Sequence, residues 1–301
     1  MIWPTYQLGD LWAANVDDDY GCRWIVLSQT YNSGPPRRTH ITDKPFGMGS
    51  YRADSDVAAR YDTIAGWCDA RAAGDGAGGM VAAEAAMDRL KRLASERGVL
   101  PLTKSTPAGD RVLQVELNTE AIRAEMWESA DGFEWQLQTA SVDPRWLSPT
   151  LLTAGPVSAG AASTDGLDWA SGSPGGLDWT PGSPGGLDWG ISGVGGVLTL
   201  TNPGTAPTWP VYTVTGPWLN PSFTDPTTGD VVAYNGLVDL GQTLVIDSSP
   251  FTRSVQLNGV DRIGLLSAVQ WIEVPPGGQV TVQCGGSGTG TVFAAWPKAD
   301  N

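Results

Sequence analysis

The sequence predicts a mainly β protein with one helix, divided into two domains by a linker that carries a repeat. Three observations support this prediction: several short runs that alternate apolar and polar residues, one stretch with helical periodicity, and closely spaced turn signals after residue 190. Composition changes near residues 150 and 190. We therefore place the first domain at 1–148, the linker at 149–190 and the second domain at 191–301.

Three runs predict strands in the first domain. Residues 23–30 are apolar and rich in β-branched side chains, which favours a strand. Residues 111–118 and 133–138 alternate, with Leu113 and Val115 on one side of the first and Phe133 and Trp135 on one side of the second. Alternation with a period of two indicates half-buried antiparallel strands.

The helix is predicted over residues 80–97. Asp88 and Arg92 are four residues apart and should face each other on its exposed side. Gly98 is expected to cap its C-terminus in the left-handed conformation. The predicted buried face consists of Met80, Ala83, Met87, Leu90 and Ala94.

The linker contains Gly-Leu-Asp-Trp three times, at 166–169, 176–179 and 186–189. It is interpreted either as a binding loop or as an extended linker whose tryptophans dock on its own or a neighbouring subunit. The second interpretation is favoured, because three ten-residue copies are too few and too short for a solenoid. Exposing three tryptophans to water is costly. Trp169, Trp179 and Trp189 are therefore predicted interface residues.

The second domain is predicted to be a β-sandwich or jelly roll. Turn signals such as Asn235-Gly236 and Asn258-Gly259 recur at short spacing. Between the turns lie short apolar or alternating runs, including 211–214, 244–246, 254–257 and 280–283. Regular short strands separated by turns are typical of these folds.

Charge and cysteine content exclude several classes of protein. The chain has 32 acidic and 18 basic residues, a net charge of −14, and a pI near 4.3. Stable nucleic-acid binding needs a basic surface, so it is not expected. No apolar run is long enough to span a membrane, and no signal peptide is expected. Cys22, Cys68 and Cys284 match neither a disulfide framework nor a zinc site, so reduced thiols are expected.

Three sequence features could indicate a binding or catalytic site, but each lacks the residues that such a site needs. Residues 74–79 fit G-x-G-x-x-G, but no buried strand precedes them and no second helix follows, so a glycine loop before the helix is favoured. Residues 17–19 are three aspartates without the rest of a calcium loop. His40 is the sole histidine, and no nucleophile motif accompanies it. We expect no enzyme activity, no cofactor and no bound metal.

The second domain contains an ordered set of segments, in which Asn202-Pro203-Gly204, Val274-Pro275-Pro276 and Trp296 stand out. With this set of segments it resembles the C-terminal domain of siphophage distal tail proteins. The first domain resembles the belt domain of the same family. Pro35-Pro36-Arg37-Arg38 precedes a tract where an extended arm is usual, and Asp143-Pro144-Arg145 resembles the family's closing motif.

This resemblance implies a structural virion protein with a galectin-like C-terminal sandwich. Members of the family form a homohexameric ring at the distal end of a non-contractile tail, where they join the tail tube to tail-tip or baseplate proteins. The implied partners are therefore other copies of the chain and these tail proteins. The alternative is a receptor- or glycan-binding tail protein that uses the sandwich to bind a host-surface glycan.

Overall fold

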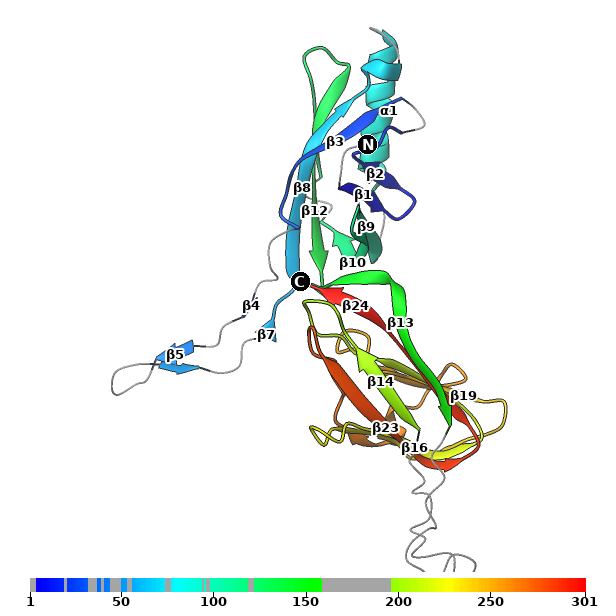
Figure 1. Ribbon diagram of the computed structural model, residues 1–301. Helices are drawn as coiled ribbons and strands as arrows, with labels where there is room; N and C mark the ends of the chain where they lie inside the picture. The colour runs from blue at the N-terminus through cyan, green and yellow to red at the C-terminus, as the bar shows by residue number, and fades with distance from the viewer. Residues whose placement is uncertain are drawn as a thin grey trace, which may run out of the picture. The chain divides into compact units, whose positions relative to one another are not determined.

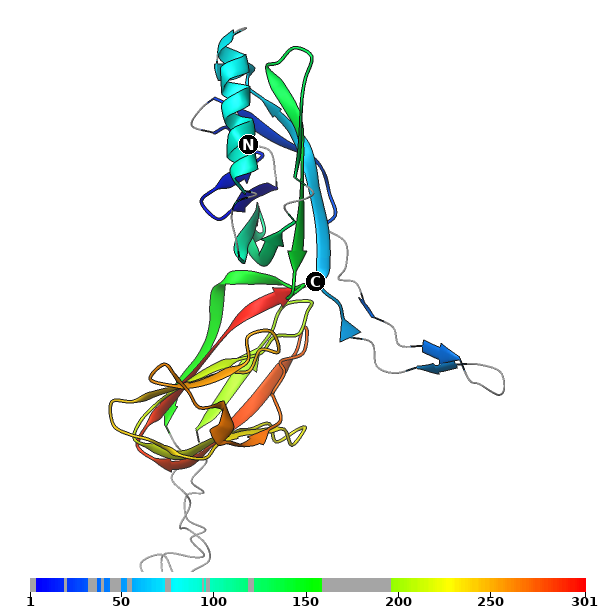
Figure 2. The same ribbon diagram turned by 180° about the vertical axis from the view of Figure 1, so that it is seen from behind.

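The computed structural model describes residues 4–18, 21–31, 37–38, 41–43, 50–52, 56–73, 77–93, 95, 98–118, 122–158 and 196–301. They form two compact units, Met1–Pro149 with Asp300–Asn301, and Thr150–Ala299. All of the strand pairs in the ladders of both units are antiparallel, and the described residues contain one α-helix (Figures 1 and 2). The predicted fold class, mainly β with a single helix, is confirmed.

The first unit is built from two connected groups of strands. One runs in the order β2-β1-β9-β10 and reaches the start of β13, and the other runs β3-β8-β12-β11, with β12 also pairing with β10. The strands are β1 (Thr5–Leu8), β2 (Trp12–Ala14), β3 (Arg23–Gln29), β8 (Arg60–Asp69), β9 (Leu100–Thr106), β10 (Gly109–Leu117), β11 (Arg123–Met126), β12 (Gly132–Ser141) and β13 (Trp146–Ser158).

The alternating runs of the first domain form strands as predicted. They correspond to β3, β10 and β12, and Leu113, Val115, Phe133 and Trp135 are all buried. Phe133 and Trp135 contact Trp24 edge to face, with ring centroids 5.5 and 6.0 Å away. This geometry is favourable for aromatic pairs. An aromatic cluster therefore occupies the middle of the first core.

The helix is present, but its bounds and its buried face differ from the prediction. α1 spans Ala77–Leu93 and packs on β8 and β12, beside the short helix η1 (Arg71–Ala73). The buried stripe consists of Gly79, Ala83, Ala86, Leu90 and Leu93. Ala83, Met87 and Leu90 contact the core as predicted, whereas Met80 is 44% exposed. Asp88 pairs with Lys91 instead of Arg92, and Gly98 has a positive φ but lies beyond the end of the helix.

The second unit is a β-sandwich. One sheet has the order β14-β23-β16-β17-β22 with β18 on β16, and the other runs from β13 through β24-β15-β19-β20 to β21. Its elements are β14 (Val197–Thr201), β15 (Val211–Thr215), β16 (Trp218–Thr224), β17 (Val231–Tyr234), β18 (Leu237–Val238), β19 (Thr243–Asp247), β20 (Ser254–Leu257), β21 (Val260–Asp261), η3 (Ile263–Leu265), β22 (Leu266–Val269), β23 (Gln279–Gly288) and β24 (Thr291–Asp300).

Contacts between the two sheets close the core of the sandwich. Tyr212 of one sheet stacks on Phe223 of the other, with centroids 4.2 Å apart and planes 4° apart. The indole of Trp296 donates a hydrogen bond to the carbonyl of Thr201 at 2.8 Å. The turn after β20 has positive φ at both Asn258 and Gly259, as the Asn-Gly signal predicts.

The start of the predicted linker is part of a strand. Residues 150–158 belong to β13, and Leu152, Ala154 and Val157 pack against the core of the sandwich. Their burial explains why this stretch is ordered as a strand despite its low complexity. Residues 150–158, which the sequence analysis placed in the linker, are therefore part of this strand. The rest of the linker, including the three repeats, lies outside the described residues.

Candidate functional site

The chain leaves and re-enters the first unit at one place, which we call the arm root. Thr30 follows β3 and Thr63 lies near the start of β8. The Thr30 amide donates to the Thr63 carbonyl at 3.0 Å, and the Thr63 amide donates to the Thr30 hydroxyl at 2.8 Å. Residues 32–59 therefore form an excursion whose two ends are held together by hydrogen bonds.

Within the excursion, the described pieces pair as a two-stranded ribbon. β4 (Arg37–Arg38) pairs with β7 (Asp56–Val57), and β5 (Ile41–Asp43) pairs with β6 (Ser50–Arg52). Both pairs are antiparallel, with Arg37 opposite Val57 and Thr42 opposite Tyr51. This is the tract where the sequence analysis expected an extended arm.

A buried ion pair lies at the arm root. Arg60 and Asp62 are 2% and 5% exposed, and the Arg60 guanidinium contacts the Asp62 carboxylate directly through Nε. Arg60 Nη2 also donates to the carbonyl of Tyr31, the last described residue before the excursion. The second Asp62 oxygen accepts a hydrogen bond from the Thr30 hydroxyl at 2.8 Å. One arginine thus links the end of the first root strand to the beginning of the second.

Tyr31 and Trp146 form the wall of the arm root. The Tyr31 hydroxyl is 2.8 Å from the Thr139 hydroxyl, and its ring meets Trp146 edge to face at 5.8 Å. Burial raises the pKa of Tyr31 far above its usual value. The Arg60 guanidinium also lies over the Trp146 ring, 6.0 Å from its centroid. Aromatic surfaces therefore keep water from the ion pair.

The Asp143-Pro144-Arg145 motif folds against the same place. Arg60 Nη1 donates to the Pro144 carbonyl at 3.4 Å. The Arg145 side chain binds the Asp143 carboxylate through Nε at 2.8 Å and Nη2 at 2.6 Å, and Arg145 is itself only 7% exposed. Two segments highlighted by the sequence resemblance, the arm and this motif, therefore meet at one buried cluster.

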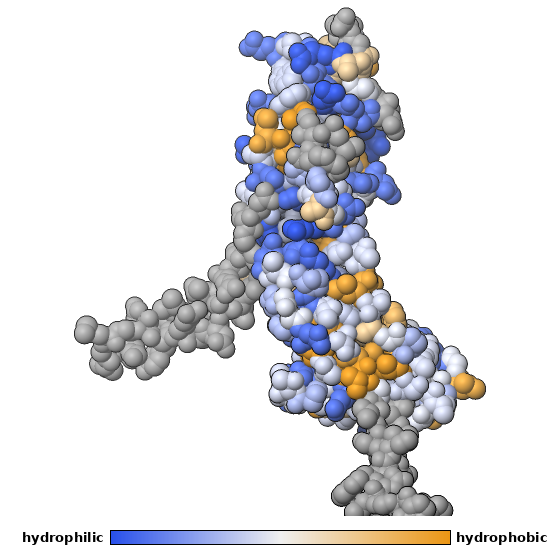
Figure 3. Space-filling view, in the orientation of Figure 1, coloured by the Kyte–Doolittle hydropathy of each residue, from blue (hydrophilic) through white to orange (hydrophobic). Residues whose placement is uncertain are grey.

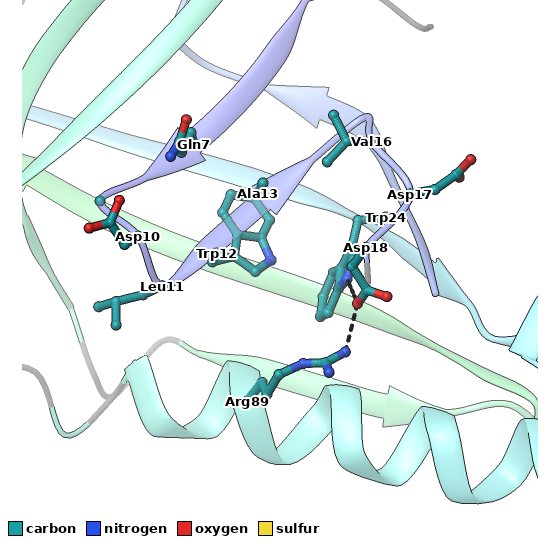
Figure 4. A pocket seen from close by; sticks show the side chains of 11 residues that line it. Gln7, Asp10, Leu11, Trp12, Ala13, Val16, Asp17, Asp18, Trp24 and Arg89 are labelled. Atoms are coloured by element: carbon teal, nitrogen blue, oxygen red, sulfur yellow. Dashed lines mark hydrogen bonds and ion pairs between the residues drawn. The ribbon is translucent and has the colours of Figure 1, made fainter. Parts of the chain in front are cut away.

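A separate pocket of about 280 Å³ lies between the β1-β2 hairpin and α1 (Figure 4). Asp18 is its central charge: one oxygen accepts from the Cys22 amide at 2.8 Å, and the other accepts from Trp24 Nε1 at 3.1 Å and Arg89 Nη2 at 2.6 Å. Asp17 pairs with Arg23 at 2.6 Å. These two carboxylates are engaged by the protein itself, and Asp18 connects the segment after β2 to the helix.

The remaining residues singled out in the sequence lie partly outside and partly inside the described part of the chain. Trp169, Trp179, Trp189 and His40 lie outside the described residues. Of the glycine loop, residues 74–76 also lie outside them, whereas 77–79 form the first turn of α1. The three cysteines are free and buried.

The sequence analysis missed the buried polar cluster at the arm root. A signal was available, because Arg60 and Asp62 are two residues apart in an alternating strand and so share the face of Ile64 and Cys68. Nothing in the alternation reveals that Tyr31 and Pro144, far away in the chain, supply the carbonyls that the arginine needs.

Fold and site together define a structural class of protein: an antiparallel β unit that carries a two-stranded ribbon, followed by a β-sandwich. Within this class, residues 203–298 match the family model described as "Siphovirus-type tail component, C-terminal domain". The sandwich is therefore similar in sequence to this C-terminal domain, and the predicted resemblance to siphophage distal tail proteins is confirmed.

One solved structure of a phage protein shares this fold. The Dit protein of phage SPP1, described as a paradigm of the hub adsorption apparatus in phages that infect Gram-positive bacteria, has a TM-score of 0.57 and 13% identity. The match covers 90% of this chain and 92% of Dit. Two structures of the phage p2 baseplate in its activated conformation match at TM-scores of 0.46 and 0.47 with 10% identity, over 97–98% of each chain. No curated protein matches the chain in sequence.

No helix in the described part of the chain is long and apolar enough to cross a membrane.

Proposed function

We propose that this chain is the distal hub of a long non-contractile phage tail. It is a structural virion protein whose copies form a homohexameric ring, and the ring joins the tail tube to tail-tip or baseplate proteins. The observation that carries the proposal is the sequence match of residues 203–298 to the siphovirus tail-component domain. The likeness to SPP1 Dit over nine-tenths of the chain supports the same overall architecture.

In this proposal the first unit supplies the ring contacts. A closed ring requires each copy to offer two complementary surfaces, one to each neighbour. The ribbon between Tyr31 and Arg60 offers such a surface, since a paired ribbon presents outer strand edges that another chain can extend. The buried ion pair at the arm root fixes the direction in which the ribbon leaves its own unit.

The proposal assigns no catalytic step to the protein. The solved structure that shares its fold, SPP1 Dit, is described as part of a hub adsorption apparatus. The buried groups at the arm root hold backbone carbonyls and each other rather than lining an open cleft. The cluster is therefore suited to fixing two chain segments rather than to binding a substrate.

The proposal is tested by native mass measurement and negative-stain imaging of the purified full chain. A ring of six copies is expected. Gold-labelled antibody against the chain should also mark the distal end of the tail on intact virions. A strict monomer at micromolar concentration, together with no label at the tail end, would contradict the hub. Retention of the full chain on host-surface glycans, lost on alteration of the sandwich alone, would favour the glycan-binding alternative.

A further inference from the structure

Two exposed leucines lie side by side on the sandwich, and a third exposed leucine follows them closely in the chain. Leu219 and Leu237 are directly opposite each other in the β16-β18 pair, and they are 44% and 47% exposed. Their strand neighbours Trp218 and Val238 are fully buried, so the two leucines stand on the outer face of the sheet. Leu240 lies three residues after Leu237 in the chain and is 83% exposed. We call Leu219, Leu237 and Leu240 the leucine patch.

The strand beside the patch carries almost no side chains. β23 runs through Gly285, Gly286 and Gly288, and only Ser287 lies opposite Leu219. A Cβ on Gly286 would lie 2.4 Å from Trp218 Nε1, and one on Gly288 would lie 2.2 Å from the Pro217 carbonyl oxygen. The packing of Trp218 thus requires glycine here. As a consequence, β23 supplies no large side chain that could cover the leucines.

The repeat segment starts and ends close to this patch. Its 37 residues, 159–195, follow Ser158 and precede Gly196, where a Cβ would lie 2.4 Å from the Ser158 carbonyl oxygen. The Gly196 carbonyl accepts a hydrogen bond from the Cys284 amide at 2.8 Å. Leu219 lies on β16, the second strand over from β14 across β23. It is opposite Ser287, which is three residues further along β23 than Cys284. With standard strand spacings, that separation is about 14 Å.

The third copy of the repeat is joined to Gly196 by a stretch of chain that is long enough to cover this distance. Trp189 precedes Gly196 by seven residues. Seven residues span at most about 23 Å when extended. As a glycine-rich chain they have a root-mean-square span of about 15 Å. The copy at 186–189 also supplies Leu187 beside Trp189, so two large apolar side chains can reach three exposed leucines.

We propose that the leucine patch is the docking surface for the third Gly-Leu-Asp-Trp unit of the same chain, with Trp189 as its anchor. Docking removes the tryptophan and the leucines from water together, and apolar burial of this kind is favourable. The short tether gives Trp189 a high effective concentration at the patch. The repeat segment is then held at the sandwich of its own subunit.

The test isolates the fluorescence of Trp189 in the full chain. The spectrum of the Trp169→Phe/Trp179→Phe variant minus that of the Trp169→Phe/Trp179→Phe/Trp189→Phe variant gives the Trp189 emission. We expect short-wavelength emission that acrylamide quenches poorly. Adding Leu219→Ser/Leu237→Ser to both backgrounds should shift this emission to longer wavelength and increase its quenching.

The matched control is Ile263→Ser/Val269→Ser, at two positions of the same domain that are 44% and 56% exposed. A control is needed because other apolar residues are also visible on the surface of the sandwich, drawn in orange in Figure 3. This variant should leave the Trp189 emission unchanged. Leu240→Ser alone, at the most exposed of the three leucines, serves if the double variant loses its circular dichroism spectrum.

Three results would overturn the proposal. Solvent-like Trp189 emission in the parent background would show that the residue does not dock. Shielded emission that is indifferent to all leucine substitutions would place its docking surface elsewhere. Shielding that disappears on dilution into the nanomolar range would assign the tryptophan to a neighbouring copy or another partner instead of its own chain.

Discussion

Arg60 is a buried cation whose charge and hydrogen-bonding groups are satisfied by Asp62, Tyr31 and Pro144. Burying two charges is costly, and the pair repays this cost only while both partners are present. Its structural value therefore lies in specificity: the arginine can be satisfied only when the Tyr31 and Pro144 carbonyls are both in place. A purely apolar root would not discriminate between registers of the two strands in this way.

Removing one partner of this pair should be far more harmful than removing both. Arg60→Met is expected to destabilise the first unit by about 3–5 kcal/mol, because Asp62 is left as an uncompensated buried charge. Arg60→Met/Asp62→Leu should recover most of that loss. Denaturant unfolding followed by circular dichroism measures both. The exposed pair Arg23–Asp17 is the control, since Arg23→Met should have a far smaller effect on stability. Equal losses in the single and double Arg60 variants would contradict this account.

The three thiols should be unreactive in the native protein. Cys22, Cys68 and Cys284 are each at most 1% exposed, and burial raises all three pKa values, that of Cys284 to about 12. A disulfide reagent at pH 8 should therefore titrate no thiol before unfolding and three after it. Rapid labelling of any cysteine in the folded chain would show that its surroundings open.

The raised thiol pKa values also make stability depend on alkaline pH. Between the usual thiol pKa of about 8.5 and about 12, Cys284 keeps its proton when folded and loses it when unfolded. The unfolded state then binds fewer protons, so the free energy of unfolding falls as pH rises through this window. Denaturant midpoints at pH 8, 9 and 10 measure this decline. Cys284→Ala should make it shallower, and an unchanged slope would exclude a contribution from this thiol.

At the scale of the elements, the strands were predictable and the contacts between distant segments were not. The alternation in β10 and β12 follows directly from burying one face of a sheet, so local sequence suffices. The face of α1 was predicted only in part: Ala83 and Leu90 are buried as expected, but Met80 is exposed, because burial at the start of the helix depends on how it approaches β8 and β12. The polar cluster at the arm root joins residues more than eighty positions apart, which no local pattern reveals.

The β3-β8 pair should depend on a glycine at position 66. The register shifts between Val26 and Ser28, and a Cβ on Gly66 would lie 1.8 Å from the Ile25 carbonyl oxygen. Gly66→Ala should therefore destabilise the first unit by about 1–3 kcal/mol through overpacking. Gly264→Ala is the matched control, because no atom lies within 4 Å of its added Cβ. Thermal melts compare the two. Equal melting temperatures would show that the strands adjust without cost.

At the scale of the whole molecule, the net charge of −14 bears on what the proposed ring can enclose. A basic ring would retain DNA by releasing counterions from it, whereas an acidic one gains nothing from such contact. Double-stranded DNA should accordingly show no measurable binding to the full chain at either 50 or 200 mM salt. The affinity of a basic DNA-binding protein falls steeply between these two salt concentrations. Salt-dependent retention of DNA would contradict an acidic channel.

Ring formation should depend on the arm and not on the repeat segment. Both excursions can be removed without stretching the fold, because each starts and ends at adjacent points: Arg60 binds the Tyr31 carbonyl, and Gly196 lies against Ser158. Replacing 33–58 with a short glycine-serine link should leave the melting temperature of the chain close to that of the parent and reduce its native mass from a ring to a monomer. The same replacement of 160–194 should leave the ring intact, since the repeat is proposed to dock on its own subunit.

A ring that survives loss of the arm would move the subunit contacts to the body of the first unit. A ring that is lost with the repeat would instead make Trp169, Trp179 and Trp189 contacts between copies.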